Sequence, residues 1–325
     1  MKNVTDILYT TDVGDYGRQF WNAMRFRQNS VSKYDSCFNT SLGSYYLPAV
    51  NEKALRNAIR SESAIRSLAT EISHYSGGGK MWAADSEDRF AFVQEGAPIP
   101  GFDADGDFTK FLLKSRKVAG LVKVNNEFVN DAAFDLEKYL TERMGRSFAL
   151  AEDSAFISGD GSTQPHGLLP PTAGAETGVT TESLSYDDVI DLFFSVKPEY
   201  RKKATWVMND RTALVLRKLK DDDGMYLWDG SHDDLLGRPV VICNDMPDIE
   251  AGSKPVLFGD FAYYWIIDRS PISSRALKEL FAETDRVGYL AFEFLDARLV
   301  RRDAVKCITV TGGAIDRYER GGLHI

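Results

Sequence analysis

The stretch AEDSAFISGDGSTQPHGLL, residues 151–169, ends the longest periodic segment of the chain and reverses it in a short glycine-rich loop. Upstream of the loop, apolar residues recur at steps of three and four from Val129 onward, as on one face of a helix. Asn130 can cap the start of this helix, and Gly159 stands where a left-handed residue commonly ends one. A helix over residues 131–157 would measure about 40 Å, at about 1.5 Å per residue. Such a length predicts a spine on which other elements pack.

The loop could hold a phosphate, carry a nucleophile or only reverse the chain. A dinucleotide-binding fingerprint needs a third glycine and a helix after it, whereas Gly159 and Gly161 follow a helix and precede Gln164. Ser162 does not stand in a G-x-S-x-G nucleophile elbow. His166 has no histidine at the spacing that metal ligation requires. The sequence therefore favours a structural turn over a catalytic loop.

Four residues of this turn have properties that suit it: Gly159, Gly161, Pro165 and Gly167. The first two glycines supply backbone freedom, the proline supplies rigidity, and the last glycine permits close packing.

Two other motifs suggest ligand binding but do not complete a site. SGGGKM, residues 76–81, lacks both the glycine spacing and the Ser or Thr of a P-loop. DADGD, Asp103–Asp107, begins like an EF-hand loop, but Phe108 and Lys114 stand where that loop needs glycine and glutamate. Both are interpreted as solvated turns, as is DDDG at residues 221–224.

The composition predicts a globular protein of one or two domains, with 43% hydrophobic residues in 325. A formal charge of −9 argues against a protein that binds nucleic acid over its whole surface, although local basic patches remain possible. Cys37, Cys243 and Cys307 form no C-x-x-C pair and are expected to be reduced thiols. Residues 7–9 are too short for a signal-peptide core, and no run approaches the roughly 20 apolar residues of a membrane span.

Residues 1–44 are polar and irregular apart from one helical segment. Tyr16, Phe20 and Met24 recur every four residues and would line one face of that helix. Because little chain surrounds this face, we expect Phe20, Trp21 and Met24 to contact a neighbouring subunit.

The next segments predict a helix and a long hairpin. Asn51 is expected to cap a helix at residues 52–60, whereas AIRSLATEIS, residues 64–73, has a period closer to that of a strand. RFAFVQ, residues 89–94, and FTKFLLKSRK, residues 108–117, flank a turn-rich tip and predict a hairpin that projects from the body.

After Pro171 the pattern becomes mixed α/β over residues 172–286. Helices are expected after Ser185 and Asn209, and short strands include MYLW, residues 225–228. Residues 287–311 alternate like the strands of a sheet.

Taken in order, FVQEGAPIP, AEDSAFISGDGSTQPHGLL, WVMNDRTALVLRKLKDDDGMYLW and LLGRPVVICNDMP closely resemble the major capsid proteins of tailed bacteriophages. The likeness extends from Tyr45 to Thr311. It implies an α+β fold of the Hong Kong 97 type, in which the glycine-rich turn has no catalytic role. The implied parts are an N-terminal arm (1–44), a peripheral domain (45–79, 119–171 and 287–312), an extended loop (80–118), an axial domain (172–286) and a C-terminal tail (313–325).

The resemblance also implies the function. Copies of the chain would form an icosahedral shell of hexamers and pentamers around double-stranded DNA, without catalysis, cofactor or metal and without contact with a membrane. The DNA would be touched weakly and without sequence preference. A portal protein and a scaffold are implied partners, and a decoration protein could be added. The shell would be the virion capsid, assembled in the cytoplasm of the bacterial host.

Two alternatives remain open at this point. An encapsulin-like nanocompartment has the same fold but encloses protein cargo, and the long N-terminal arm weakens this interpretation. A phosphate-binding enzyme that uses the loop at residues 159–167 is the more distant alternative.

The chain also departs from the family in two ways. It has no helical coiled-coil scaffolding region at its start, so the scaffold is either separate or already removed. Some members join subunits through a lysine–asparagine bond, but the hairpin tip from Gln94 to Gly106 has no lysine, and Lys80 and Lys110 are the nearest.

Opposite charges gather in two segments of the sequence. Residues 85–107 contain seven acidic residues and one arginine, and residues 298–306 carry a formal charge of +3. We expect the acidic loop of one subunit to dock on this basic segment of a neighbour, which we interpret as a strand; two solvated faces that never meet are the alternative. The acidic residues are Asp85, Glu87, Asp88, Glu95, Asp103, Asp105 and Asp107, and the basic ones are Arg298, Arg301, Arg302 and Lys306.

Overall fold

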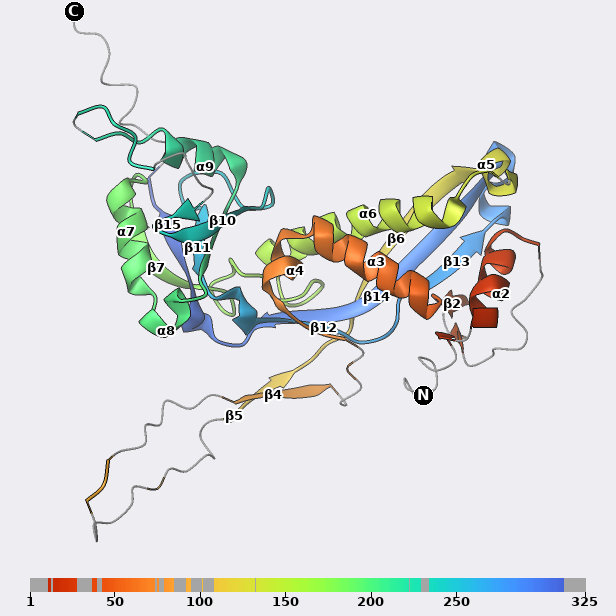
Figure 1. Ribbon diagram of the computed structural model, residues 1–325, viewed down its shortest axis with the longest axis horizontal. Helices are drawn as coiled ribbons and strands as arrows, with labels where there is room; N and C mark the ends of the chain where they lie inside the picture. Colours follow the sequence, from red (N-terminus) through yellow and green to blue (C-terminus); the bar gives the residue numbers. More distant parts are fainter. Residues whose placement is uncertain are drawn as a thin grey trace, which may run out of the picture.

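The computed structural model shows two sheets side by side and a two-stranded ribbon that projects from them (Figure 1). It describes residues 11–12, 14–27, 37–39, 43–73, 75, 79–84, 92–94, 101, 108–131, 133–221, 223–228 and 234–312.

The larger sheet has seven strands and is built around β14 (Arg286–Leu299). β6 (Arg116–Asn125) runs antiparallel along one side of β14, from the pair Arg286 and Asn125 to the pair Leu295 and Arg116. On the opposite side of β14, β13 leads on to β2 and β1, and β12 leads on to β3. Their bounds are β1 Phe38–Asn39, β2 Ser44–Tyr46, β3 Thr70–Ile72, β12 Tyr264–Asp268 and β13 Ser273–Leu277.

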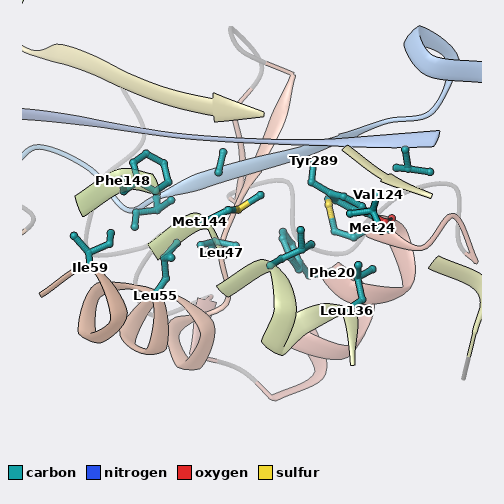
Figure 2. Packing of buried hydrophobic residues seen from close by; sticks show 14 of the residues in the cluster. Phe20, Met24, Leu47, Leu55, Ile59, Val124, Leu136, Met144, Phe148 and Tyr289 are labelled. Carbon is teal, nitrogen blue, oxygen red and sulfur yellow. Dashed lines mark hydrogen bonds between the residues drawn. The ribbon is translucent and has the colours of Figure 1, made fainter. Parts of the chain in front are cut away.

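Helices pack along this sheet and bury its apolar side chains. They are α2 (Gly14–Met24), α3 (Ala49–Glu62), α4 (Ala64–Leu68), α5 (Asn126–Asn130) and the spine helix α6 (Leu136–Ser158). Figure 2 shows side chains from α2, α3 and α6 meeting those of the sheet, with Phe20, Leu136 and Tyr289 in the same buried cluster. The predicted stripe is therefore buried at Leu136, Leu140, Met144, Phe148 and Ala155, whereas Ala151 is exposed.

Four local predictions around these helices are wrong in whole or in part. The spine helix begins at Leu136 rather than residue 131, because Asp135 caps it while Asn130 ends the separate helix α5. Asn51 lies inside α3, which starts directly after Pro48. Residues 64–68 are helical rather than extended, since the Ser63 hydroxyl accepts the Arg66 N–H as a cap. The strand predicted within residues 64–73 is therefore confirmed only at β3, Thr70–Ile72. Gly159 ends α6 with a φ of −56°, not in the left-handed region.

The smaller sheet has six strands in the order β7, β15, β11, β8, β10, β9. Their bounds are β7 Glu176–Thr181, β8 Thr205–Met208, β9 Asp234–Leu235, β10 Arg238–Ile242, β11 Val256–Gly259 and β15 Val305–Val310. Helices α7 (Tyr186–Ser195), α8 (Pro198–Arg201) and α9 (Asp210–Arg217) enclose a second core around Trp206. Short 3₁₀ helices also occur at η3 (Phe261–Tyr263), η4 (Glu279–Thr284) and η5 (Arg302–Ala304).

Both helix starts predicted in this region are confirmed. Ser185 forms a capping box with Asp188, and the Asn209 side chain accepts the Thr212 N–H at the start of α9. The strand expected at residues 225–228 is absent from the described structure, where Tyr226 makes a single bridge with Lys220.

The sheets do not divide the chain where the sequence predicts. β12 and β13 lie within the range 172–286 but pair with β14 of the larger sheet. β15 lies within the range 287–312 but pairs with β7 and β11 of the smaller one. The reason is that the chain crosses between the sheets twice near its end, which alternation along the sequence does not reveal.

The ribbon consists of β4 (Lys80–Ala84) and β5 (Phe108–Leu112), paired from Lys80 with Leu112 to Ala84 with Phe108. It projects away from both sheets (Figure 1). The second strand of the predicted hairpin is thus confirmed in part, but the first lies at Lys80–Ala84, and residues 92–94 are not a strand. Trp82, Phe108 and Leu112 are exposed on the ribbon.

Candidate functional site: a structural turn and the surfaces of assembly

The turn after the spine helix is held by backbone hydrogen bonds and by the larger sheet. The Gly167 N–H donates to the Gly159 carbonyl at 3.0 Å, and the Gly161 N–H to the Pro165 carbonyl at 3.3 Å. The His166 N–H donates to Ala297 of β14 at 3.1 Å, and the Tyr264 hydroxyl donates to the His166 carbonyl at 2.7 Å. The loop is therefore fixed to the sheet as well as closed on itself.

Two positions in the turn require glycine, because a side chain there would clash or would need a left-handed backbone. Gly161 has a φ of +69°, in the left-handed region, and a Cβ there would stand 2.1 Å from the His166 ring. A Cβ on Gly167 would stand 2.5 Å from the Gly159 nitrogen. These contacts agree with the turn predicted from the sequence.

Arg116 at the start of β6 connects the turn to the sheet. Its guanidinium donates to the Gly161 carbonyl and to the Asp296 carboxylate, and more weakly to the Ser162 carbonyl at 3.4 Å. Both members of the Arg116–Asp296 pair are buried. Nothing in the sequence pattern indicated this arginine, because its partners lie 45 and 180 residues away.

The loop does not offer its amides to a phosphate. The Asp160 carboxylate already accepts the N–H groups of Ser162, Thr163 and Gln164 at 2.9–3.0 Å. These bonds, led by the Gln164 N–H, lower the pKa of Asp160 to about 2. An anion is therefore in place at neutral pH, and a second one would be repelled. Burial, followed by Arg298 and Arg116, lowers the pKa of His166, so its imidazole is a poor phosphate partner too.

The arm helix α2 corrects one expectation. Phe20 and Met24 are 0% and 3% exposed because they pack on the chain's own core, beside Leu47 and Tyr289 (Figure 2). The premise that the chain has too little material to bury this face is therefore wrong. Trp21 remains half-buried, with its indole N–H donating to Asn51, so it is the residue of the three that still presents surface to a neighbour.

The basic residues at 298–306 do not lie on one strand as expected. Arg298 belongs to β14, Arg301 and Arg302 to the turn that follows, and Lys306 to β15. Arg302 donates to the carbonyls of Gly174 and Pro171 at 2.9 and 2.7 Å, and Lys306 to that of Ser195 at 2.8 Å. Arg298 lies 4.9 Å from the Phe111 ring of the ribbon. The acidic residues expected to dock here, from Asp85 to Asp107, lie outside the described residues.

The sequence reasoning also missed a buried charge cluster. Arg56, Arg66, Glu52, Glu152, Asp268 and Glu293 meet beneath α3, α4 and α6. They are scattered over some 240 residues of sequence, and each one alone resembles an ordinary surface residue, so only the fold brings them together.

Cys37, Cys243 and Cys307 are all buried, and none of them takes part in a disulfide. Among the residues that the structure describes, no group of three or more His, Cys, Asp and Glu side chains is arranged to hold a metal ion. No helix in the same part of the chain is both long and apolar enough to span a bilayer.

Comparison with known families gives a match to the phage capsid family over residues 43–310. A curated relative, the major capsid protein of Klebsiella oxytoca phage phiKO2, is 23% identical over 173 residues. That match covers 49% of this chain and 40% of the relative, so the chain spans less than half of that curated protein.

Solved structures show a likeness over more than three quarters of the chain. The capsid of a native GTA particle is 29% identical, with a TM-score of 0.64 over 78% of this chain and 91% of that one. The structure titled Microbacterium phage Oxtober96 is 17% identical, with a TM-score of 0.55 over 77% of this chain and 91% of that one. At that identity the second likeness speaks for the fold alone.

Proposed function

The chain belongs to the phage capsid family, and we propose that it is the major capsid protein of a tailed bacteriophage, many copies of which assemble into an icosahedral shell. Its α+β fold of the Hong Kong 97 type, expected from the sequence, is confirmed by the capsid structures that it matches. The observation that carries the proposal is the match over residues 43–310, which includes the spine helix, the ribbon and both sheets except β1.

The geometry supports a role in packing rather than in chemistry. The glycine-rich turn is closed by its own aspartate and fixed to the sheet by Arg116, so it serves the fold. The ribbon, in contrast, stands off the body with Trp82, Phe108 and Leu112 exposed. Exposed apolar side chains on a projecting two-stranded ribbon are expected to be covered by another molecule, since such a ribbon is only marginally stable alone.

We therefore propose that the ribbon lies on a neighbouring subunit of the same shell. The larger sheet with its helices would be the peripheral domain and the smaller sheet the axial domain, with β15 assigned to the axial part and β12 and β13 to the peripheral part. Hexamers and pentamers, a portal protein, a scaffold and weak contact with enclosed double-stranded DNA belong to the same proposal.

Electron microscopy of the purified chain, expressed alone and with a scaffold, tests the proposal. We expect closed shells, which enclose DNA when the packaging components are present. Shells that hold only protein cargo would instead support an encapsulin-like compartment. A chain that stays monomeric by size-exclusion chromatography under both conditions would contradict the proposal.

A further inference from the structure

A buried cluster of six charged residues joins the helices to the centre of the larger sheet. Glu152 of the spine helix, Asp268 of β12 and Glu293 of β14 are each 0% exposed. Two arginines, Arg56 of α3 and Arg66 of α4, stand among them, and Glu52 of α3 is 5% exposed. The cluster therefore connects three helices to two strands away from water.

The charges of this cluster do not balance if every group is ionised. Two guanidinium groups face four carboxyl groups, and Glu71 of β3 adds a fifth at 4.0 Å from Arg66. A buried charge without a partner is costly, and an acidic group in this position takes up a proton instead. At least one carboxyl group is therefore expected to be neutral.

The contacts identify Glu293 as that group. Arg66 binds Glu152 at 2.5 and 3.1 Å, and Asp268 receives Arg56 at 2.6 Å and Arg66 at 3.2 Å. Glu293 lies farther from both arginines, at 3.5 and 4.0 Å, and neither of its oxygens accepts a hydrogen bond from any of them.

The surroundings of Glu293 favour its protonated form. Burial, then the adjacent Glu152 carboxylate, raise the pKa of Glu293 well above its usual range, against the opposing effect of Arg66. Asp268 acts in the same direction as Glu152. On β6, which pairs with β14, the ammonium group of Lys117 lies over the Phe292 ring at 4.4 Å.

We propose that Glu293 carries a proton at neutral pH, donates it to the Glu152 carboxylate, and thereby forms a pH-sensitive latch between the spine helix and the central strand of the sheet. Removal of this proton leaves two adjacent buried carboxylates that repel each other, because Arg66 is already hydrogen-bonded to Glu152. The latch is therefore closed in acid and weakened in alkali, at a junction on which the core of the larger sheet depends.

The sign of the pH dependence follows from the raised pKa. Below about pH 4 the folded and unfolded chains both hold the proton, and this group contributes its full stability. As the pH rises further, the unfolded chain releases the proton while the folded chain keeps it. The folding equilibrium then weakens by up to about tenfold per pH unit until Glu293 itself titrates.

Chemical denaturation of the purified full-length chain from pH 5 to 9 tests the latch, and no shell is needed. Glu293→Gln keeps the shape and supplies a permanent donor to Glu152. We expect it to match the wild type near pH 5 and to become progressively more stable than the wild type above that pH. Glu142→Gln on the exposed face of the same helix is the matched control and should run parallel to the wild type. Parallel curves for Glu293→Gln and the wild type would overturn the proposal.

Infrared spectroscopy gives a second measurement in case the variant does not fold. The wild type at pH 7 should show the carbonyl band of a protonated carboxylic acid, and this band should fade in alkali together with the loss of stability. Absence of such a band at pH 7 would also overturn the proposal. Where Glu293→Gln does fold, the band should be weaker in its spectrum.

Discussion

Gly145 of the spine helix lies against Ala58 of α3 so closely that a Cβ added to Gly145 would stand 2.6 Å from the Ala58 Cβ. Backbone atoms of Ala58 and Ile59 lie 3.4 and 3.5 Å from the same point. The two helices therefore cross almost backbone to backbone at this point, and both contribute side chains to the core shown in Figure 2. Glycine at this position is a packing requirement, because its φ does not fall in the left-handed region.

Substitution of Gly145 should separate the two helices. Gly145→Val is expected to lower the free energy of unfolding by about 1–3 kcal/mol, since the surrounding core is closed and overpacking costs about this much. Denaturant titration of the purified chain measures the change. Gly120→Ala is the control, because a Cβ there meets nothing within 4 Å. Equal effects of the two substitutions would contradict the role of the close crossing.

Arg116 should contribute far more to stability than an arginine in an exposed ion pair. Arg116→Ala leaves the buried Asp296 carboxylate without its cation and frees the Gly161 carbonyl, and breaking such a buried pair costs about 3–5 kcal/mol. Arg211→Ala removes a 2.6 Å pair with Asp248 in which the arginine is 82% exposed, and should cost about 0–1 kcal/mol. Thermal unfolding of both variants checks the ranking, and similar shifts would contradict it.

Helix ends that carry a local capping signal could be predicted from the sequence. The elements against which each helix or strand packs could not. The starts of α7 and α9 were predicted correctly from the capping residues Ser185 and Asn209. Each of these starts depends on a hydrogen bond between the capping side chain and the backbone N–H three residues later, which is a local signal. The start of the spine helix was misplaced because Asn130 and Asp135 are both good caps, and only the packing of α5 decides between them.

The candidate site divides in the same way. The turn at Gly161 and Gly167 was predicted from residue properties alone. The arginine that holds it, Arg116, and the carboxyl pair of Glu152 and Glu293 could not be found. Arg116 contacts Asp296, 180 residues away, and Glu152 and Glu293 are likewise far apart along the chain. For the same reason the sheet membership of β12, β13 and β15 is invisible in a single sequence.

The arm helix should be required for folding. Phe20→Ala opens a cavity at a fully buried position and should cost about 3–5 kcal/mol of unfolding free energy. Deletion of residues 1–35, which removes this helix, should for the same reason expose the core and destabilise the protein. Arg18→Ala, on the exposed face of the same helix, is the control. A denaturation midpoint unchanged by Phe20→Ala would show that α2 does not stabilise the chain.

Subunits of the mature shell should not be joined covalently through the hairpin tip. Residues 94–106 contain no lysine, and the ammonium group of Lys110, on β5, lies over the Trp82 ring at 5.7 Å. Denaturing gels of purified mature particles should therefore show a single band at the mass of the chain. A ladder of multimers that survives boiling in detergent would refute this expectation.

The acidic segment at residues 85–107 should promote assembly through charge. Seven acidic residues against one arginine give it a formal charge of −6, and we propose that it meets the basic residues at 298–306 of a neighbouring subunit. Reversal of Arg301 and Arg302 to glutamate is an ambiguous test, because Arg302 also holds the carbonyls of Gly174 and Pro171 within its own chain. Reversal on the acidic side avoids this difficulty.

Asp103, Asp105 and Asp107 should therefore be changed together to lysine, and assembly yield measured by sedimentation. Each exposed ion pair contributes only about 0–1 kcal/mol, but the contact is repeated at every subunit of a shell. We expect the yield to fall most at low ionic strength, since charge effects lose their reach as the Debye length shrinks from about 30 Å at 0.01 M salt to about 3 Å at 1 M. Asn at the same three positions is the control and should give an intermediate yield. If the lysine variant assembles like the wild type in low salt, the acidic segment does not dock on a basic surface.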